Sequence, residues 1–315
     1  MARQDPVTIV GPPLDAWLTA AMLARFAPLA GAPLQVLETT PIAGDNEQVI
    51  LRPEMVRTHV SIGLNPARLV ARPVQAWTGP QGQSLPFKGF GQPLKGVSFV
   101  SIWLRAREEL GEQRPLASFS AADDTRAFAI EAGRYAQALK AIATEVGVTR
   151  CEQASGLIVH SDSDVAAANS ASLIGAAAIS LKPSMTMRLH ALHQTVLALI
   201  ECWPWRDSDR DLAAREYNRR VTAMRSSMSD MQSILWNDER PHERSSNLRH
   251  RIAVWQKVGR IAPMDDDPFQ PQEWMAAFLH AGSVPSGAGR LAKSLTHAEI
   301  SAHTQACALK EVANV

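Results

Sequence analysis

The chain has 315 residues, a formal net charge of +1, and contents of 46% hydrophobic and 20% charged residues. This length allows one large or two modest domains with a real core, and the composition is that of an ordinary globular protein. The near-neutral charge argues against nucleic acid or a membrane surface as a partner. No apolar run approaches the roughly 20 residues that a membrane-spanning helix needs.

The cysteines Cys151, Cys202 and Cys307 are widely spaced and odd in number. Because no CxxC pair occurs, we expect neither a disulfide framework nor a zinc site, and we predict no metal. The N-terminus has Arg3 but no apolar signal-peptide core before Pro6, so we expect a cytoplasmic protein.

The first third of the chain has the pattern of a βαβ unit. Val7–Val10 predicts a buried strand, an apolar helix is expected from about Ala16 to Phe26, and Leu34–Glu38 predicts a second strand. A right-handed parallel crossover is the default for this order of elements.

The next part of the chain is less regular. Residues 65–97 are rich in proline and glycine and predict loops with short irregular strands, whereas residues 98–105 are compatible with a helix or a strand. Farther on, apolar residues from Phe128 to Val146 recur every three or four positions, which predicts one helical face that ends before Gly147.

A strand is expected within residues 148–159, and the second half of the chain is predicted to be helical. Thr296 and Glu299 have the spacing of a capping box at the start of the last helix. The longest predicted helix carries an apolar stripe, which we interpret as core: Tyr217, Val221, Met224, Met228, Met231 and Leu235.

The turn after the first strand reads Gly-Pro-Pro-Leu-Asp-Ala, where a phosphate-binding loop has Gly-x-Gly-x-x-Gly. Gly11 suits a tight turn, but Pro12 and Pro13 have no N–H group to donate, and Asp15 would repel a phosphate. Two interpretations stay open. The segment is a packing unit whose helix is capped by Asp15, or it is a weakened nucleotide site.

Two further sets of residues could carry chemistry. Glu38 ends the second strand, where an acid can bind a ribose hydroxyl. His190 and His193 are three apart on a predicted helix, but without an evident acidic partner we expect them to be solvated or at the edge of the core.

Several stretches, in order, resemble flavin-dependent tryptophan halogenases, a group of FAD-monooxygenase-like proteins. The first is VTIVGPPLDAWLTAAMLARF, with Trp17 where the family has a tryptophan, and LQVLETTPIAG follows. Later stretches are AGRYAQALKAIATEVGVTR, IGAAAISLKPSMTMRLHALHQ and EWMAAFLHAGSVP. The resemblance implies an FAD-binding-like α/β domain over residues 1–165, with a partial Rossmann-like parallel sheet. A mainly helical C-terminal part over 166–315 would pack on it.

The resemblance also implies a set of FAD-contacting positions. In this sequence they are Gly11, Pro13, Ala16, Glu38 and Pro183. Because the glycine loop is degraded, we regard FAD as doubtful and these positions as remnants of a cofactor site.

The catalytic positions of the family differ in this chain. The alignment places Leu69 at the family's catalytic lysine, Met185 at its glutamate, and Ile179 where a glycine adjoins the flavin ring. A long middle section is also absent, between about Asp164 and Ala171. A leucine cannot form a chloramine and a methionine cannot act as a carboxylate, so the resemblance implies loss of halogenation.

We therefore expect a shortened pseudoenzyme that acts by binding, as a homodimer or with a full-length homologue, because the absent section would expose apolar surface. An FAD-dependent oxidoreductase or monooxygenase with altered chemistry is the alternative. A third possibility is a halogenase in which other residues take the catalytic roles, such as Lys88, Lys95, Lys140 or Glu152.

Overall fold

The computed structural model describes residues 5–27, 32–41, 46–66, 69, 71–119, 127–161, 171–173, 185–203, 209–236, 245–287 and 289–312. The chain divides into two compact units, one formed by residues 1–74 and 126–226 and the other by 75–125 and 227–315. This division differs from the boundary expected after residue 165. The helix over residues 185–201 lies beyond that boundary but packs with the first helix. Residues 75–125, which were expected in the first domain, belong to the second unit.

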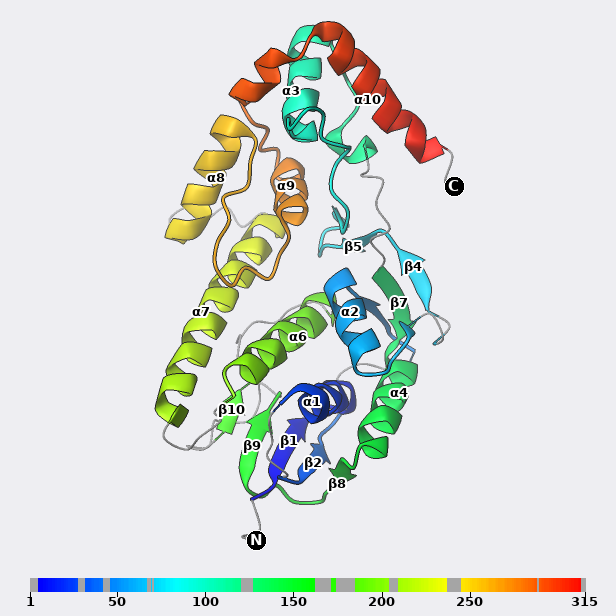
Figure 1. Ribbon diagram of the computed structural model, residues 1–315, viewed down its shortest axis with the longest axis vertical. Coiled ribbons are helices and arrows are strands. Elements are labelled where there is room, and N and C mark those ends of the chain that lie inside the picture. The colour runs from blue at the N-terminus through cyan, green and yellow to red at the C-terminus, as the bar shows by residue number, and fades with distance from the viewer. Residues whose placement is uncertain are drawn as a thin grey trace. The chain divides into compact units, whose positions relative to one another are not determined.

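The first unit is built on a parallel sheet, which within the described residues has five strands in the order β10-β9-β1-β2-β8 (Figure 1). β1 pairs with β2 from Val7 and Leu34 to Gly11 and Glu38, so these last two residues adjoin at the carboxyl edge. The predicted parallel βαβ arrangement and α/β class are confirmed. The strands are β1 (Val7–Gly11), β2 (Leu34–Glu38), β8 (Thr149–Arg150), β9 (Leu157–His160) and β10 (Ala171–Leu173).

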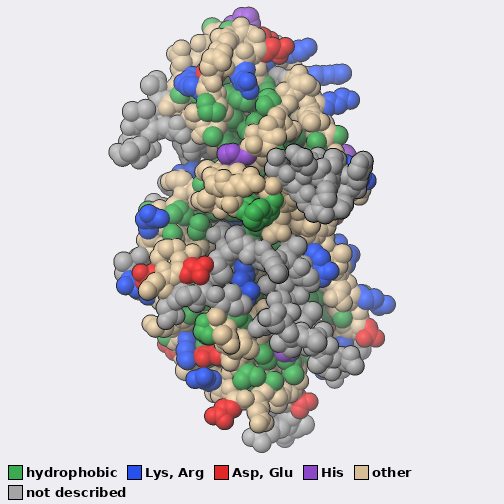
Figure 2. Space-filling view, turned by 180° about the vertical axis from the view of Figure 1, so that it is seen from behind, with side chains coloured by type: hydrophobic (Ala, Val, Ile, Leu, Met, Phe, Trp, Pro, Cys, Tyr) green, Lys and Arg blue, Asp and Glu red, His purple; other side chains and the backbone are tan. Residues whose placement is uncertain are grey.

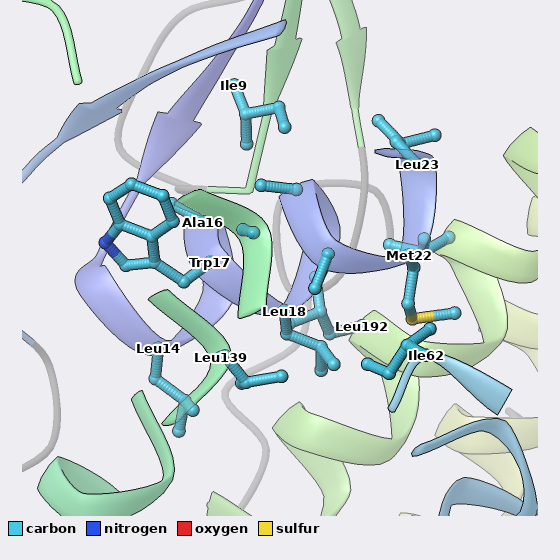
Figure 3. Packing of buried hydrophobic residues seen from close by; sticks show 14 of the residues in the cluster. Ile9, Leu14, Ala16, Trp17, Leu18, Met22, Leu23, Ile62, Leu139 and Leu192 are labelled. Carbon is cyan, nitrogen blue, oxygen red and sulfur yellow. The ribbon is translucent and has the colours of Figure 1, made fainter. Parts of the chain in front are cut away.

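The helix α1 (Pro13–Phe26) crosses between β1 and β2 and is buried on every side from Leu14 to Leu23. It begins three residues earlier than expected because a proline is well tolerated at the first helical position. Its apolar side chains share one core with the sheet, α4 (Ala132–Glu145) and α6 (Met185–Glu201). Figure 3 shows Leu18 of α1 close to Leu192 of α6 within this core.

An antiparallel sheet of β3 (Gln48–Leu51), β7 (Ala127–Glu131) and β4 (Arg72–Val74) also belongs to the first unit, with α2 (Pro53–Ser61). The predicted helical face was too long at both ends. Phe128 lies in β7, where it pairs with Leu51, and Val146 is exposed beyond the last residue of α4. The helix α4 begins directly after β7, and Phe128 lies four residues before Ala132. Its position therefore matched the helical spacing although it belongs to the strand. The strand expected within 148–159 is two strands, β8 and β9.

The second unit contains the hairpin β5 (Ala76–Thr78) and β6 (Ser84–Pro86), followed by helices. Residues 98–105 form part of a helix, α3 (Phe99–Leu110), whose N-cap Ser98 accepts a hydrogen bond from the backbone of Ser101. The other helices assigned to it are the short η2 (Leu116–Ser118) and η5 (Arg290–Ser294), α8 (Ser246–Val258), α9 (Pro271–His280) and α10 (His297–Val312).

The long helix α7 (Arg210–Leu235) carries the predicted apolar stripe, and all six of its residues are buried. The predicted capping box of α10 is also confirmed. The backbone N–H of Thr296 donates to Glu299 Oε2 at 2.7 Å, and the backbone N–H of Glu299 donates to Thr296 Oγ1 at 3.3 Å. Within the described ranges, no helix is both long and apolar enough to cross a membrane.

Candidate functional site

The carboxyl edge of the parallel sheet brings together Gly11, Glu38 and Ser161. The backbone N–H of Ser161 donates to Val10 at 3.0 Å, and that of Thr39 donates to Gly11 at 2.8 Å. In open α/β sheets, ligands bind outside the carboxyl ends of the strands. This edge is therefore the candidate site, and two of the predicted cofactor positions lie on it.

Gly11 is packed against a side chain of the chain itself. A Cβ atom at this position would lie 1.8 Å from Ser161 Oγ, which is far inside any real contact. The first glycine of a nucleotide loop serves the tight turn, whereas the pyrophosphate approaches the second position, which is Pro13 in this chain. Gly11 is therefore a tightly packed turn residue that contacts Ser161.

The start of α1 differs from the expected capped helix. Pro12 is the N-cap and no side chain caps the helix; Asp15 lies within the first turn, so its predicted capping role was wrong. Its buried carboxylate instead binds the guanidinium of Arg188 on α6, with 2.5 Å between Oδ2 and Nη2. Pro13 is half-buried, and Ala16 is fully buried in the core.

Glu38 is bonded within the chain. Its Oε1 accepts hydrogen bonds from Trp17 Nε1 at 2.7 Å and Lys140 Nζ at 3.3 Å, and Arg150 Nη2 lies 3.5 Å from Oε2. Lys140 also lies 5.1 Å from the centre of the Trp17 ring. Burial raises the pKa of Glu38, but these bonds and cations outweigh it, so that the pKa lies below its usual range. The residue is a carboxylate that already holds three partners.

The residues aligned with the family's catalytic positions are only partly described. Leu69 is half-buried and packs against the core of the first unit, and its backbone N–H donates to Pro66 at 3.0 Å. Met185 is the first residue of α6. Pro183, Ile179 and residues 164–170 lie outside the described residues.

A buried polar cluster joins α2, α4 and α6. His59 Nδ1 donates to the carbonyl of Met55, and His59 Nε2 accepts from the hydroxyl of Tyr135. His193 Nε2 lies 3.0 Å from Thr58 Oγ1, while its Nδ1 is buried without a hydrogen-bond partner in the described structure. Burial lowers the pKa of His59 to about 4, and burial together with the nearby His59 lowers that of His193 to about 3. Both imidazoles are therefore neutral at physiological pH.

Glu54 lies beside this cluster. Arg52 Nε binds its Oε1 at 2.6 Å, and His190 Nδ1 lies 3.5 Å from the same oxygen. Burial raises the pKa of Glu54, but the charges of Arg52 and His190 outweigh it and lower that pKa to about 2. The expectation that His190 and His193 are solvated or at the edge of the core was wrong, because both are fully buried. The acidic neighbour missed in the sequence is Glu54.

The residues considered as substitutes for the catalytic pair are divided between the two units, and two of them are already paired. Lys140 is bound to Glu38 in the first unit, and Lys95 Nζ is paired with Glu299 at 2.5 Å in the second. Glu152 is exposed after β8. In the parts of the chain that the structure describes, no group of histidines, cysteines and acids could hold a metal ion.

The partners of the candidate residues were not visible in the sequence. Arg188 follows Asp15 by 173 positions, and Ser161 follows Gly11 by 150, with no motif that links either pair. The bond between Trp17 and Glu38 is the one contact that the sequence could have suggested. A buried tryptophan N–H group requires an acceptor, and Glu38 ends the adjacent strand.

Comparisons with known proteins agree with the resemblance. The family model described as tryptophan halogenase matches residues 165–297. A search of curated protein sequences found no match.

Among solved structures, the chain is similar to BrvH, a flavin-dependent halogenase from Brevundimonas sp. BAL3. The TM-score is 0.76 at 16% identity, over 97% of this chain and 95% of that one. It is also similar to Xcc4156, a flavin-dependent halogenase from Xanthomonas campestris, with a TM-score of 0.78 at 15% identity over 98% and 95%. For a tryptophan halogenase from Shewanella frigidimarina the TM-score is 0.74 at 12% identity, over 99% and 96%. The predicted resemblance is confirmed in sequence for residues 165–297 and in fold for nearly the whole chain.

The Trp17–Glu38 bond predicts a measurable coupling energy. In a double-mutant cycle with Trp17→Phe and Glu38→Ala, followed by urea unfolding, we expect about 1–2 kcal/mol of interaction energy, since Glu38→Ala leaves the buried N–H group of Trp17 without its acceptor. Lys140→Met serves as the control that removes only the cation. Additive single-variant effects would contradict the assigned role of Glu38.

The neutral histidines predict an acid-dependent loss of stability that begins near pH 6.5. Below this pH the two histidines become protonated in the unfolded chain but stay neutral in the folded chain. The free energy of unfolding therefore falls as the pH decreases toward the folded-state pKa values, about 4 for His59 and about 3 for His193. The loss from Glu54 begins only near pH 4.5 and extends toward pH 2.

The measurement is denaturant unfolding between pH 7 and 5 for wild type and His193→Gln, which retains a donor for Thr58 but does not titrate. We expect the variant to lose less stability over this range. His250→Gln, at an exposed position, controls for the residue change. An unchanged slope in His193→Gln would refute the buried neutral state.

Proposed function

We propose that this shortened and divergent tryptophan-halogenase-like chain has lost halogenation and acts by binding, as a pseudoenzyme. One observation carries the proposal: described groups that would face a flavin nucleotide at the carboxyl edge are engaged within the chain. Ser161 fills the space at Gly11, and Trp17 holds Glu38. Two prolines at the start of α1 remove N–H donors that a phosphate would use.

The side chains at the aligned catalytic positions support the same conclusion. Leu69 is aliphatic and contributes to core packing, so it offers no amine. Met185 offers no carboxylate at the start of α6. General acid–base or electrostatic catalysis by the family's lysine and glutamate would therefore have no counterpart at these two positions.

The relatives are named flavin-dependent, so FAD is a plausible ligand for the fold. For this chain we propose that FAD binds weakly or not at all. When bound to a protein, FAD supplies redox chemistry. The residues that would have to hold its adenosine and phosphate end here are Gly11, Pro13, Ala16 and Glu38, and their described surroundings favour packing within the chain.

Purified protein is expected to be colourless and to leave the visible spectrum of added FAD unchanged. The check is absorbance after purification and equilibrium dialysis with FAD, with a flavin-dependent halogenase as a positive control. A yellow protein that retains stoichiometric flavin would contradict the proposal and favour the alternative, an FAD-dependent oxidoreductase with altered chemistry. Flavin-dependent halogenation of tryptophan that is lost in Lys88→Ala or Lys95→Ala would favour an intact halogenase instead.

We further propose that the binding partner is a second copy of the chain or a full-length homologue, in the cytoplasm. The first unit exposes large apolar side chains in its described part, namely Phe26, Val60, Val146, Leu157 and Leu212. A partner bound over these side chains would remove their apolar surface from water, which favours association. On the face shown in Figure 2, Lys and Arg side chains lie at several separate places, with apolar and uncharged groups between them.

Light scattering at micromolar protein concentration is expected to give twice the mass of the chain, because a partner would cover the exposed apolar residues. Where the protein is monomeric, coexpression with a full-length homologue is expected to give a copurifying complex. A protein that is monomeric and also fails to copurify with the homologue would contradict the proposal of a partner.

A further inference from the structure

Four exposed cations lie close together in the second unit, where α8 and η5 both pack on α3. A Cβ atom at Gly259, just after α8, would lie 3.0 Å from Leu104 Cδ1. One at Gly289, just before η5, would lie 3.5 Å from Ser101 Oγ. Because Ser101 and Leu104 are three positions apart in α3, they share one helix face and bring the end of α8 to the start of η5. The cations that flank this junction, which we call the basic surface, are Lys257, Arg260, Arg290 and Lys293.

Further hydrogen bonds hold the same segments in place. The backbone N–H of Ser286 donates to the carbonyl of Gln256 at 2.8 Å, directly before the first cation. At the other end of η5, the guanidinium of Arg105 donates to the carbonyl of Leu295 at 2.9 Å and to that of Ala292. The backbone that carries the basic surface is therefore fixed by the packing of the second unit itself.

The four cations form no ion pair in the part of the chain that the structure describes. Other exposed cations there are paired, as Lys95 is with Glu299. Of the acids near the end of α3, Glu109 is bound by another arginine, and exposed Glu108 pairs with none of the four. Lys257 suits the last turn of α8, where a cation is favourable, but the other three lie outside that helix. Like charges repel, so folding does not account for their concentration here.

Two aliphatic side chains are exposed among these cations. Leu291 follows Arg290 in η5 and is 60% exposed, and Val284, two residues before Ser286, is 43% exposed. Residues three apart in a 3₁₀-helix are in line, so Arg290 and Lys293 project from one side of η5, with Leu291 on the adjacent side. The basic surface thus combines unpaired positive charge with aliphatic groups in contact with water.

This combination matches an acidic polypeptide better than it matches other anions. An arginine binds a carboxylate through two parallel hydrogen bonds, and apolar contacts beside charged pairs are typical of protein–protein interfaces. Single-stranded nucleic acid is bound with aromatic side chains for base stacking, and residues 256–261 and 284–294 include none. Stable attachment to a membrane needs a second anchoring signal besides a basic patch.

We propose that the basic surface binds an acidic segment of a partner protein. Carboxylates of that segment pair with the four cations, and one of its aliphatic side chains packs against Leu291 and Val284. The proposal rests on the proposed function, in which the chain acts by binding a protein, and it names the chemistry of the partner and the surface of the second unit that receives it.

The test uses a short fluorescein-labelled peptide of glutamate and leucine as the probe, with a glutamine and leucine peptide as its uncharged match. Fluorescence anisotropy at low ionic strength is expected to show binding of the glutamate peptide to the wild-type chain, and added sodium chloride is expected to weaken it. The glutamine peptide is expected to remain free. Equal binding of both peptides would overturn the proposal, because charge would then contribute nothing.

Two variants with the same change in net charge locate the binding site. The first replaces three cations of the basic surface, Arg260→Gln, Arg290→Gln and Lys293→Gln, and is expected to bind the probe at least about tenfold more weakly. The second replaces three exposed arginines of the first unit, Arg25→Gln, Arg57→Gln and Arg72→Gln, and is expected to bind like wild type. Equal losses in the two variants would reduce the effect to net charge and overturn the proposal.

The aliphatic part of the surface is tested with the cations intact. Leu291→Ser is expected to weaken binding about threefold or more, because the probe then loses an apolar contact. Leu110→Ser, at an exposed position at the end of α3, is the matched control and is expected to leave binding unchanged. Since each replaced side chain is exposed, all variants are expected to keep the wild-type melting temperature. If the triple variant of the basic surface does not fold, Arg290→Gln and Lys293→Gln are measured singly.

Two other polyanions serve as competing probes. Tighter binding of phosphatidylserine vesicles or of a single-stranded oligonucleotide than of the glutamate peptide would overturn the proposal and assign the surface to that anion. A colourless protein that binds none of the three probes overturns this inference and leaves the loss of halogenation standing. Stoichiometric flavin in the purified protein overturns the proposed function instead.

Discussion

The complete burial of α1 is the constraint on which the first unit depends. Ten consecutive residues of this helix, Leu14–Leu23, are buried between the parallel sheet, α4 and α6. A buried polar group without a partner costs about 1–3 kcal/mol. The polar groups of α1 therefore require partners inside the protein, and each polar side chain in this stretch has one. Asp15 binds Arg188, Trp17 donates to Glu38, and Thr19 donates to the carbonyl of Asp15.

The same constraint explains the changed character of the carboxyl edge. In a nucleotide-binding βαβ unit, the start of the helix and the acid after the second strand face a ligand. Here the acid serves the tryptophan of α1 and the glycine accommodates a serine from the end of β9. In this structure, residues at positions typical of ligand recognition are thus in contact with other residues of the chain, although Glu38 itself is only half-buried.

A second polar interior lies between α2, α4 and α6, where neutral histidines take the place of apolar packing. His59 bridges the backbone of α2 and Tyr135 of α4, and His193 connects α6 to Thr58. The carboxylate of Asp15 lies near enough to Tyr135 to add to the effect of burial, and both raise the pKa of the phenol. The charged pair at the start of α1 and the histidine cluster are therefore neighbours within one unit.

The amino-acid sequence by itself determined the local elements and the class of fold. Alternation and helical spacing depend on adjacent residues, so Val7–Val10, Leu34–Glu38, the stripe of α7 and the capping box at Thr296 could be read directly. Phe128 shows the limit of this reading, because one strand residue can match a helical period by chance. The family resemblance likewise depends on the order of segments along the chain. Only the tertiary structure decided that Asp15 binds Arg188, that Ser161 fills the space at Gly11, and that His190 and His193 are buried beside Glu54. These contacts join residues more than a hundred positions apart, and their existence depends on how helices pack on the sheet, which no local pattern encodes.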